Sequence, residues 1–294
     1  DLFFLKVTDG NKSGIGECGL FRGLSCDDVP EYEQRLQWLC DHIDLSFEVL
    51  KENLRGYPSI WIGYEQAMRN LEFGSDFYFP GEFTEGHGSI RINGLIWMGD
   101  SEFMREQIEE KLKLGFHCLK LKIGTDWPSE KEIIEKLRKI YSPETLELRV
   151  DANGAFEFNQ AKTVLKDLAD LYVHSIEQPI KADQTDVMAQ LCRETPTPIA
   201  LDEELIGINT PEAKLQLLEK IRPQFIILKP SLCGGFSGTD EWINGANSVG
   251  ADWWITSALE SNIGLNAIAQ YTYTKNNPMP QGLGTGALFK NNFD

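Results

Sequence analysis

Ionisable residues stand at the ends of five successive apolar runs from residue 118 onward. They are Lys120 and Lys122, then Asp151, Glu177, Asp202 and Lys229. From Lys122 onward, neighbouring members are 25 to 29 positions apart. That spacing is typical of one strand plus one helix, so each residue is expected at the carboxyl end of a parallel strand. In barrel enzymes these ends meet at the face that holds the active site, so the pattern predicts one site built by five strands.

Three of these residues are carboxylates on consecutive predicted strands. Asp151, Glu177 and Asp202 offer hard oxygen ligands, which suit Mg²⁺ or Mn²⁺. Without a cation, three carboxylates at one place would repel one another and raise their pKa values. The sequence therefore predicts a single divalent metal site at these three residues.

The lysines predict a base beside that metal. Lys120 and Lys122 are two positions apart in an apolar run, so both side chains are expected to face into the barrel. Two ammonium groups side by side lower each other's pKa, and a lysine brought to about 7–8 is a general base near neutral pH. Lys229 would approach from the other side. A base beside a Lewis acid fits removal of a proton α to a carboxylate.

Short apolar runs alternate with amphipathic stretches from residue 89 onward, which predicts βαβ units and a parallel sheet. The runs are residues 90–97, 118–123, 146–150, 173–176, 199–201, 225–228 and 253–256, with a possible eighth at 282–288. Helices are expected at residues 102–114, 129–140, 159–171 and 211–221, among others. Seven or eight strands favour a closed barrel. The alternative is an open doubly wound sheet, but the sequence has no dinucleotide-binding or P-loop glycine motif that would support it.

The first 88 residues have a different pattern. Residues 2–7 and a second run ending at Glu17 predict a hairpin around Asp9-Gly10-Asn11, followed by helices at 30–41 and 57–71. Residues 73–88 are rich in glycine, phenylalanine and acids, which predicts a loop and a boundary. We therefore expect an N-terminal α+β domain at residues 1–88 and a barrel domain at 89–294.

Composition excludes several function classes. The chain has 28 Lys and Arg against 45 Asp and Glu, a net charge of −17, which argues against nucleic acid or an anionic membrane as partner. No stretch approaches the ~18 apolar residues of a membrane span. The six scattered cysteines predict reduced thiols in a cytoplasmic protein. We expect a small-molecule carboxylate as substrate, and the oligomeric state stays open.

The chain resembles the enolase superfamily, and within it the muconate-lactonising subgroup. The matching segments are Lys120-Leu121-Lys122, Val150-Asp151-Ala152-Asn153, Ile176-Glu177-Gln178-Pro179, Leu201-Asp202-Glu203 and Leu228-Lys229-Pro230-Ser231. The resemblance implies a modified (β/α)₇β TIM-type barrel with an α+β capping domain, and a lysine on each side of the substrate. Relative to that family, a strand and loop are missing before Asp1, so the N-terminus is expected to be incomplete. The last residues are expected to pack on the cap.

Further segments resemble the o-succinylbenzoate synthases of that subgroup. They are residues 257–261 with Gly264-Leu265, Gly234-Gly235, and residues 93–97. This likeness implies a lyase of menaquinone biosynthesis that dehydrates a succinyl-substituted hydroxycyclohexadiene carboxylate. It implies that Lys122 moves the proton, that Lys229 stays cationic, and that Mg²⁺, or Mn²⁺, is the cofactor. The residues implied to bind substrate oxygens are Lys120, Asn153, Thr256 and Ser257.

Three other functions stay open. An N-acylamino acid racemase or dipeptide epimerase of the same subgroup would use both lysines as bases, although Gly282–Gly286 lacks the acidic pair of the dipeptide epimerases. A muconate cycloisomerase is separated only weakly by the sequence. A barrel that merely binds a ligand would not need five charged strand ends.

Overall fold

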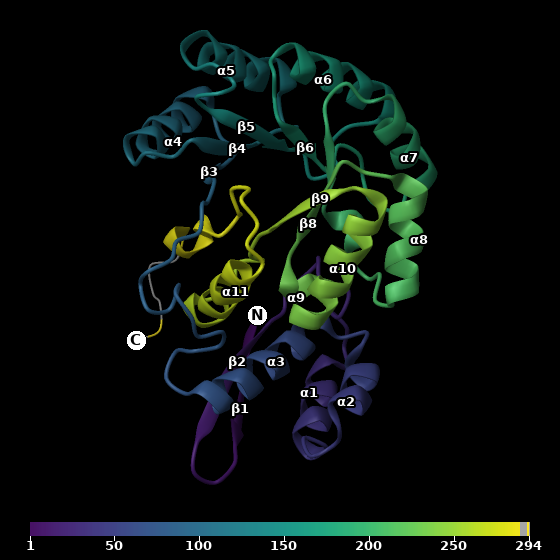
Figure 1. The fold of residues 1–294 in the computed structure, drawn as a ribbon. Coiled ribbons are helices and arrows are strands. Elements are labelled where there is room, and N and C mark those ends of the chain that lie inside the picture. Colours follow the sequence, from purple (N-terminus) through teal and green to yellow (C-terminus); the bar gives the residue numbers. More distant parts are fainter. Residues whose placement is uncertain (289–292, 294) are drawn as a thin grey trace.

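The computed structural model describes residues 1–288 and residue 293, and its first part is a hairpin packed on helices (Figure 1). The elements are β1 (Leu2–Thr8), β2 (Ser13–Gly19), α1 (Tyr32–Asp41), α2 (Phe47–Leu54) and α3 (Pro58–Phe73). The hairpin turns where Asp9 Oδ1 accepts the N–H groups of Asn11 and Lys12, each at 2.8 Å. The predicted hairpin and the helices at 30–41 and 57–71 are confirmed, whereas α2 was not predicted.

Helix α3 lies directly on β2 because glycines leave no side chains between them. A Cβ added at Gly16 would lie 1.9 Å from the carbonyl oxygen of Gly63, and one at Gly14 would lie 2.1 Å from that of Ala67. Real Cβ atoms do not approach backbone atoms so closely, so only glycine fits these two positions. Around this contact, Leu5 and Leu39 belong to the apolar core of the hairpin and helices.

A seven-stranded parallel sheet follows, with its strands in chain order. They are β3 (Gly94–Ile96), β4 (Cys118–Lys122), β5 (Glu147–Asp151), β6 (Ser175–Glu177), β7 (Ile199–Leu201), β8 (Phe225–Leu228) and β9 (Asp252–Ile255). Figure 1 shows the sheet curling around an axis, with helices along its outside. The predicted barrel of strands and helices is therefore confirmed, since the strands fall on the predicted runs.

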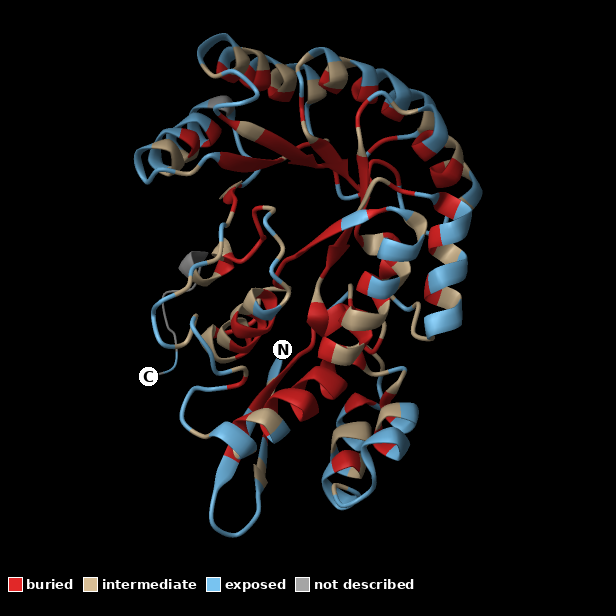
Figure 2. Cartoon of the chain, viewed as in Figure 1, coloured by how far each residue is buried: buried red, intermediate tan, exposed pale blue. Residues whose placement is uncertain are grey.

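The helices of this part cover the sheet and turn their buried sides toward it (Figure 2). They are α4 (Ser101–Lys113), α5 (Trp127–Ile140), α6 (Phe158–Asp170), α7 (Thr185–Glu194), α8 (Pro211–Ile221), α9 (Pro230–Cys233), α10 (Gly235–Val249) and α11 (Asn262–Thr274), with 3₁₀ turns η1 (Glu203–Leu205) and η2 (Gly284–Leu288). Within the described residues, no helix combines the length and the apolar character that crossing a membrane requires.

Within the described residues, the barrel closes without a regular eighth strand. Gln281 pairs with Ile92, just before β3, and Gly282 pairs with Thr256, just after β9, each as a single bridge. The chain then forms η2 instead of continuing as a strand. The possible strand at residues 282–288 is therefore wrong. Three glycines in the run, at 282, 284 and 286, give little strand propensity.

Two buried glutamates of the hairpin and α3 reach the starts of barrel helices. Glu65 on α3 accepts the N–H groups of Phe236 and Ser237, at 2.5 and 3.1 Å, in the first turn of α10. Glu17 on β2 accepts the N–H of Ser261, at 2.9 Å, where α11 begins. Carboxylates at these positions satisfy backbone donors that a helix leaves unpaired at its N-terminus. They join the two parts of the chain.

The predicted division at residues 88 and 89 stays a prediction, as does the packing of the last residues on the cap. The rings of Phe293 and Phe4 on β1 lie with their centroids 5.1 Å apart. Residues 289–292 and 294 lie outside the described residues.

Candidate active site

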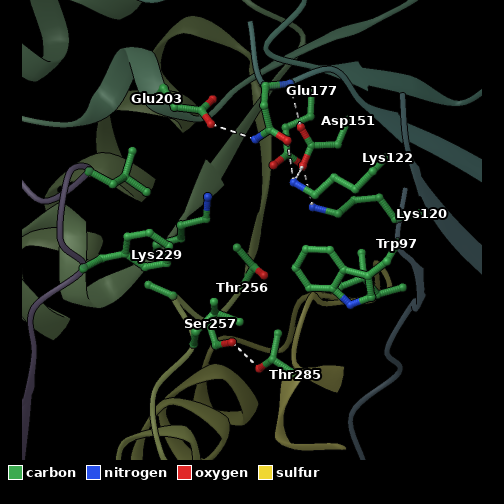
Figure 3. Close-up of a pocket in the computed structure, with 16 residues that line it drawn as sticks. Trp97, Lys120, Lys122, Asp151, Glu177, Glu203, Lys229, Thr256, Ser257 and Thr285 are labelled. Carbon is green, nitrogen blue, oxygen red and sulfur yellow. Dashed lines mark hydrogen bonds and ion pairs between the residues drawn. The ribbon is translucent and has the colours of Figure 1, made fainter. Parts of the chain in front are cut away.

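A cavity of about 200 Å³ opens at the carboxyl ends of the barrel strands. Figure 3 shows Lys120, Lys122, Asp151 and Glu177 on one side of it and Lys229 on the other, with Trp97, Thr256, Ser257 and Thr285 below them in this view. Its lining residues are Phe21, Leu24, Leu95, Trp97, Lys120, Lys122, Asp151, Asn153, Glu177, Glu203, Lys229, Thr256, Ser257, Ala258, Leu259 and Thr285. Eight of the nine predicted site residues are in this set, and Asp202 is not.

The register of the sheet brings the first charged residues together. Lys122 pairs with Asp151 across β4 and β5, and Asp151 pairs with Glu177 across β5 and β6. The amine of Lys122 lies 2.6 Å from Asp151 Oδ2 and 2.7 Å from Asn153 Oδ1. The amine of Lys120 lies 2.9 Å from Glu177 Oε2 and 3.3 Å from Asp151 Oδ2. Both lysines therefore face inward, as the two-residue period predicts.

Lys229 reaches the cavity from the opposite side (Figure 3). It follows β8, and its amine forms an ion pair with Asp202, which follows β7. Asp202 is 2% exposed and lies behind this amine, which explains why it does not line the cavity. The structure thus brings the predicted lysines and carboxylates together as two ion-paired groups, one around Asp151 and one formed by Lys229 and Asp202.

The charges of this network set the pKa values of its members. Burial opposes ionisation of Asp151, but the ammonium groups of Lys120 and Lys122 outweigh burial and hold its pKa well below the usual range. For Glu177, burial and the neighbouring Asp151 carboxylate raise the pKa well above its ordinary value. Because two negative charges share one site, the pKa of one carboxyl group is lowered and the pKa of the other is raised.

The pKa of Lys120 differs from the sequence expectation, whereas Lys229 is held as a cation, as expected. Burial alone would lower the pKa of Lys120, but the carboxylates of Glu177 and Asp151 outweigh it and raise that pKa. Lys229 behaves alike, because Asp202 and Glu177 outweigh burial and raise its pKa. For Lys120 the two carboxylates, and not a neighbouring lysine, therefore dominate the pKa.

The arrangement suits a divalent cation at one specific place. Glu177 Oε1 is buried and, among the described residues, has no hydrogen-bond partner. A buried carboxylate oxygen left without a donor is costly, and a hard cation would satisfy it. No group of three or more His, Cys, Asp or Glu side chains within the described residues is already gathered as a metal site. The amine of Lys122 forms an ion pair with Asp151, and the amine of Lys229 forms one with Asp202.

Glu203 was not predicted as a site residue, yet it lines the cavity. It opens the turn η1 directly after Asp202, and its Oε1 accepts the side-chain amide of Asn153 at 2.8 Å. Burial and the Asp202 charge raise its pKa. Glu204 instead turns away from the cavity and accepts hydrogen bonds from Gln178 and Thr185. The Asp202-Glu203 doublet is the signal that could have pointed to Glu203.

A further wall of the cavity combines apolar side chains with a cluster of hydroxyl groups. Trp97 and Leu95 come from the end of β3, and Phe21 and Leu24 come from the loop after β2. Thr256 donates its hydroxyl to the Gly282 carbonyl at 2.7 Å. The hydroxyls of Ser257 and Thr285 are hydrogen-bonded to each other. The contribution of the β2 loop depends on packing between distant segments, so periodicity along the sequence could not reveal it.

Comparison with known proteins places this site in a family. A family model described as enolase C-terminal domain-like matches residues 103–288, which contain all nine predicted site residues. The chain belongs to the enolase superfamily. Membership confirms the resemblance inferred from the strand-end residues.

Individual superfamily members are also similar to the chain. It is 51% identical over 238 residues to an o-succinylbenzoate synthase of Desulfotalea psychrophila (strain LSv54 / DSM 12343). The matched region covers 80% of this chain and 64% of that relative. The chain thus spans slightly less than two thirds of that relative's length. A crystal structure of MenC from Desulfotalea psychrophila LSv54 has a TM-score of 0.86 and 41% identity, and the match covers 99% of this chain and 90% of that one.

A more distant superfamily structure shares the fold. It is an o-succinylbenzoate synthase from Thermosynechococcus elongatus BP-1, described as complexed with Mg in the active site. Its TM-score is 0.77 at 21% identity, over 96% of this chain and 84% of that one. At this identity the likeness concerns the fold.

Proposed function

We propose that the protein is an o-succinylbenzoate synthase, a lyase that dehydrates 2-succinyl-6-hydroxy-2,4-cyclohexadiene-1-carboxylate to o-succinylbenzoate in menaquinone biosynthesis. The observation that carries the proposal is the placement of Lys122 and Lys229 on opposite sides of one cavity beside buried carboxylates. The 51% identity to a synthase of this name supports the choice among superfamily activities. We further propose a cytoplasmic enzyme whose partner is this small carboxylate, with no nucleic acid or membrane partner.

We assign Asp151, Glu177 and Asp202 to a Mg²⁺ site that also suits Mn²⁺. Two features support this assignment: Oε1 of Glu177 has no hydrogen-bond partner in the part of the chain that the structure describes, and all the donors are oxygens. When bound, the ion would supply positive charge against the negative charge that develops on the substrate carboxylate during proton loss. The lysine amines that now face Asp151 and Asp202 would then turn toward the substrate.

Lys122 carries the proton in this proposal. Its amine takes the proton from the ring carbon that bears the carboxylate. The resulting ammonium group then delivers that proton to the hydroxyl on the adjacent carbon, which leaves as water while the ring becomes aromatic. Asn153 Oδ1, at 2.7 Å, orients the amine of Lys122 between these two positions.

Lys229 remains a cation across the ring face. A desolvated ammonium over a π-system contributes about 1–2 kcal/mol and also offsets negative charge in the transition state. Lys120, Asn153, Thr256 and Ser257 are proposed to bind the substrate oxygens, since all four line the cavity. The apolar wall around Trp97 excludes water from the reacting ring.

The test is an assay of the purified protein with the succinyl-cyclohexadiene substrate and Mg²⁺, following the ultraviolet absorbance of the aromatic product. We expect kcat/KM on this substrate to exceed that on N-acylamino acids and dipeptides by a large factor. Equal or better turnover of either competitor would replace the assignment with racemisation or epimerisation.

One rival keeps structural support. An N-acylamino acid racemase of the same subgroup would need two amines on opposite faces of the substrate, and the approach of Lys122 and Lys229 from different sides of the cavity supports this rival (Figure 3). Solvent deuterium incorporation into recovered N-acylamino acid would reveal it. A dipeptide epimerase is less favoured, because Gly282–Gly286 carries no acid for an amino group. A muconate cycloisomerase would be detected by lactone formation.

A further inference from the structure

One wall of the cavity is a short segment between β9 and α11. Ser257, Ala258 and Leu259 of this segment line the cavity, and Glu260 and Ser261 follow directly. The segment begins just after the barrel strand and ends at the N-cap of α11. The shape of this wall therefore depends on what holds a five-residue connection in place.

The connection has an unusual backbone conformation. Leu259 has a φ of +66°, in the left-handed region that residues other than glycine seldom adopt. A branched side chain persists there only when its surroundings enforce the geometry. The next residue, Glu260, is 1% exposed and supplies two such restraints.

The carboxylate of Glu260 links the wall to the segment that carries Lys229. Its Oε2 accepts the Ala258 N–H at 2.7 Å, which closes the turn around Leu259. Its Oε1 accepts the hydroxyl of Ser231 at 2.5 Å. Ser231 is two residues after Lys229, in the short helix α9. One side chain thus connects both halves of the cavity without lining it.

Glu17 of β2 holds the far end of the same connection. Its carboxylate accepts the N–H groups of Ser261 and Gly264, both at 2.9 Å, as well as the Ser261 hydroxyl. A Cβ at Gly264 would lie 2.9 Å from Glu17 Oε2 and 3.0 Å from Glu260 Cβ. The two glutamates therefore pack on either side of a position where only glycine fits comfortably.

We propose that Glu260 is a positioning residue, which acts through Ala258 and Ser231 to set the distance between the Ser257–Leu259 wall and Lys229. It does not touch the substrate. For catalysis the inference rests on the proposed function, because the wall and Lys229 are the substrate contacts of that proposal. For geometry it rests only on the contacts of Glu260.

Hydrogen exchange of the ligand-free full chain tests the geometry. In Glu260→Ala, we expect exchange in peptides covering residues 256–262 to accelerate about tenfold or more, because the Ala258 N–H loses its acceptor. Peptides covering β4 should exchange as in the wild type. Glu260→Gln should retain protection, since its amide can accept from Ala258 and donate to Ser231. Glu219→Ala, at an exposed glutamate of α8, is the matched control.

Kinetics on the proposed substrate tests the consequence. Glu260→Ala should raise KM about tenfold or more, while Glu260→Gln restores it to near the wild-type value. The inference is overturned if residues 256–262 exchange at the wild-type rate in Glu260→Ala. It is also overturned if all peptides accelerate together, which would indicate a loss of general stability. If the wild type does not turn over the substrate, the proposed function fails while the exchange result still decides the role of Glu260.

Discussion

Lys122 and Asp151 are direct partners across the parallel strands β4 and β5, and the amine of the first lies 2.6 Å from a carboxylate oxygen of the second. The backbone register sets this proximity. Each of the two is the last residue of its strand, and both side chains face inward. The sheet therefore holds the proposed base and a proposed metal ligand at the same level, which is more precise than a placement on loops.

Exchanging each of the two opposed lysines for arginine should give different results. Lys122→Arg should lower kcat by at least about 10²–10⁴-fold, because a guanidinium cannot accept the proton. Lys229→Arg should retain measurable dehydration with a raised KM, because it keeps the charge. Measurements of kcat at saturating Mg²⁺, with folding checked by circular dichroism, decide this. A Lys229→Arg enzyme as inactive as Lys122→Arg would favour the racemase with two bases.

Removing the metal should abolish turnover and lower stability. Mg²⁺ should raise the Tm of the wild type in a concentration-dependent way, because an ion that binds only the folded state stabilises it by mass action. Glu177→Gln should reduce this shift strongly, since it replaces the buried carboxylate whose Oε1 has no partner in the described part of the chain. Glu219→Gln on the surface of α8 should not change it. Full activity in excess chelator would contradict the proposed site.

Stability should depend on pH through Glu65. Burial raises the pKa of Glu65 to about 7, whereas an unfolded glutamate titrates near 4.3. The folded state therefore binds more protons between these pH values, and stability falls as pH rises from about 4.3 to 7. Glu65→Gln mimics the protonated acid, so it should remove this decline and be more stable than wild type above pH 7, by on the order of 3 kcal/mol.

Urea unfolding at pH 5, 6, 7 and 8 measures this effect. The free energy of unfolding of Glu65→Gln should exceed that of the wild type by a margin that is smallest at pH 5 and grows toward pH 8. A constant difference over the whole range would show that Glu65 does not titrate in this window.

Arg149 should matter for stability although it is not in the cavity. It is 1% exposed inside the barrel, donates to Glu147 at 2.6 Å and to the Pro280 carbonyl at 2.9 Å, and lies 4.1 Å from the ring centre of Trp254. Arg149→Met should lower the free energy of unfolding by roughly 2 kcal/mol, because it breaks a half-buried ion pair with Glu147 and leaves the buried Pro280 carbonyl without its donor. Arg193→Met, on the exposed side of α7, serves as the control in urea unfolding. Equal effects in both variants would refute this role.

The strand ends were predictable from the sequence because a parallel barrel repeats one simple pattern. An apolar run that ends in a charged residue predicts where the strand lies and that its last side chain stands at the carboxyl end of the barrel. This holds for Lys122, Asp151 and Glu177. Asp202 follows the same rule along the chain, but its side chain ends behind the amine of Lys229. The identity of an ion-pair partner depends on the barrel's curvature, which local sequence does not encode.

Other features depended on long-range packing or on weak propensity. The cavity contacts of Phe21 and Leu24 arise only once the hairpin has docked on the barrel. The closing bridges at Gln281 and Gly282 are single residues, too short to produce a strand pattern. Glu203 differs from Glu204 only in which side of the 3₁₀ turn η1 it occupies, and the turn was not predictable from the run of acids.

Glu17 and Glu65 limit how freely this protein's parts can be recombined. Each carboxylate from the N-terminal part completes the first turn of a barrel helix, α11 and α10 respectively. A chimera that joins this barrel to the N-terminal part of another superfamily member would need a side-chain oxygen acceptor at both positions, and glycines at 235 and 264 to receive these side chains. Evolution of a new specificity by exchanging whole caps is therefore constrained by two helix ends that belong to the other half of the molecule.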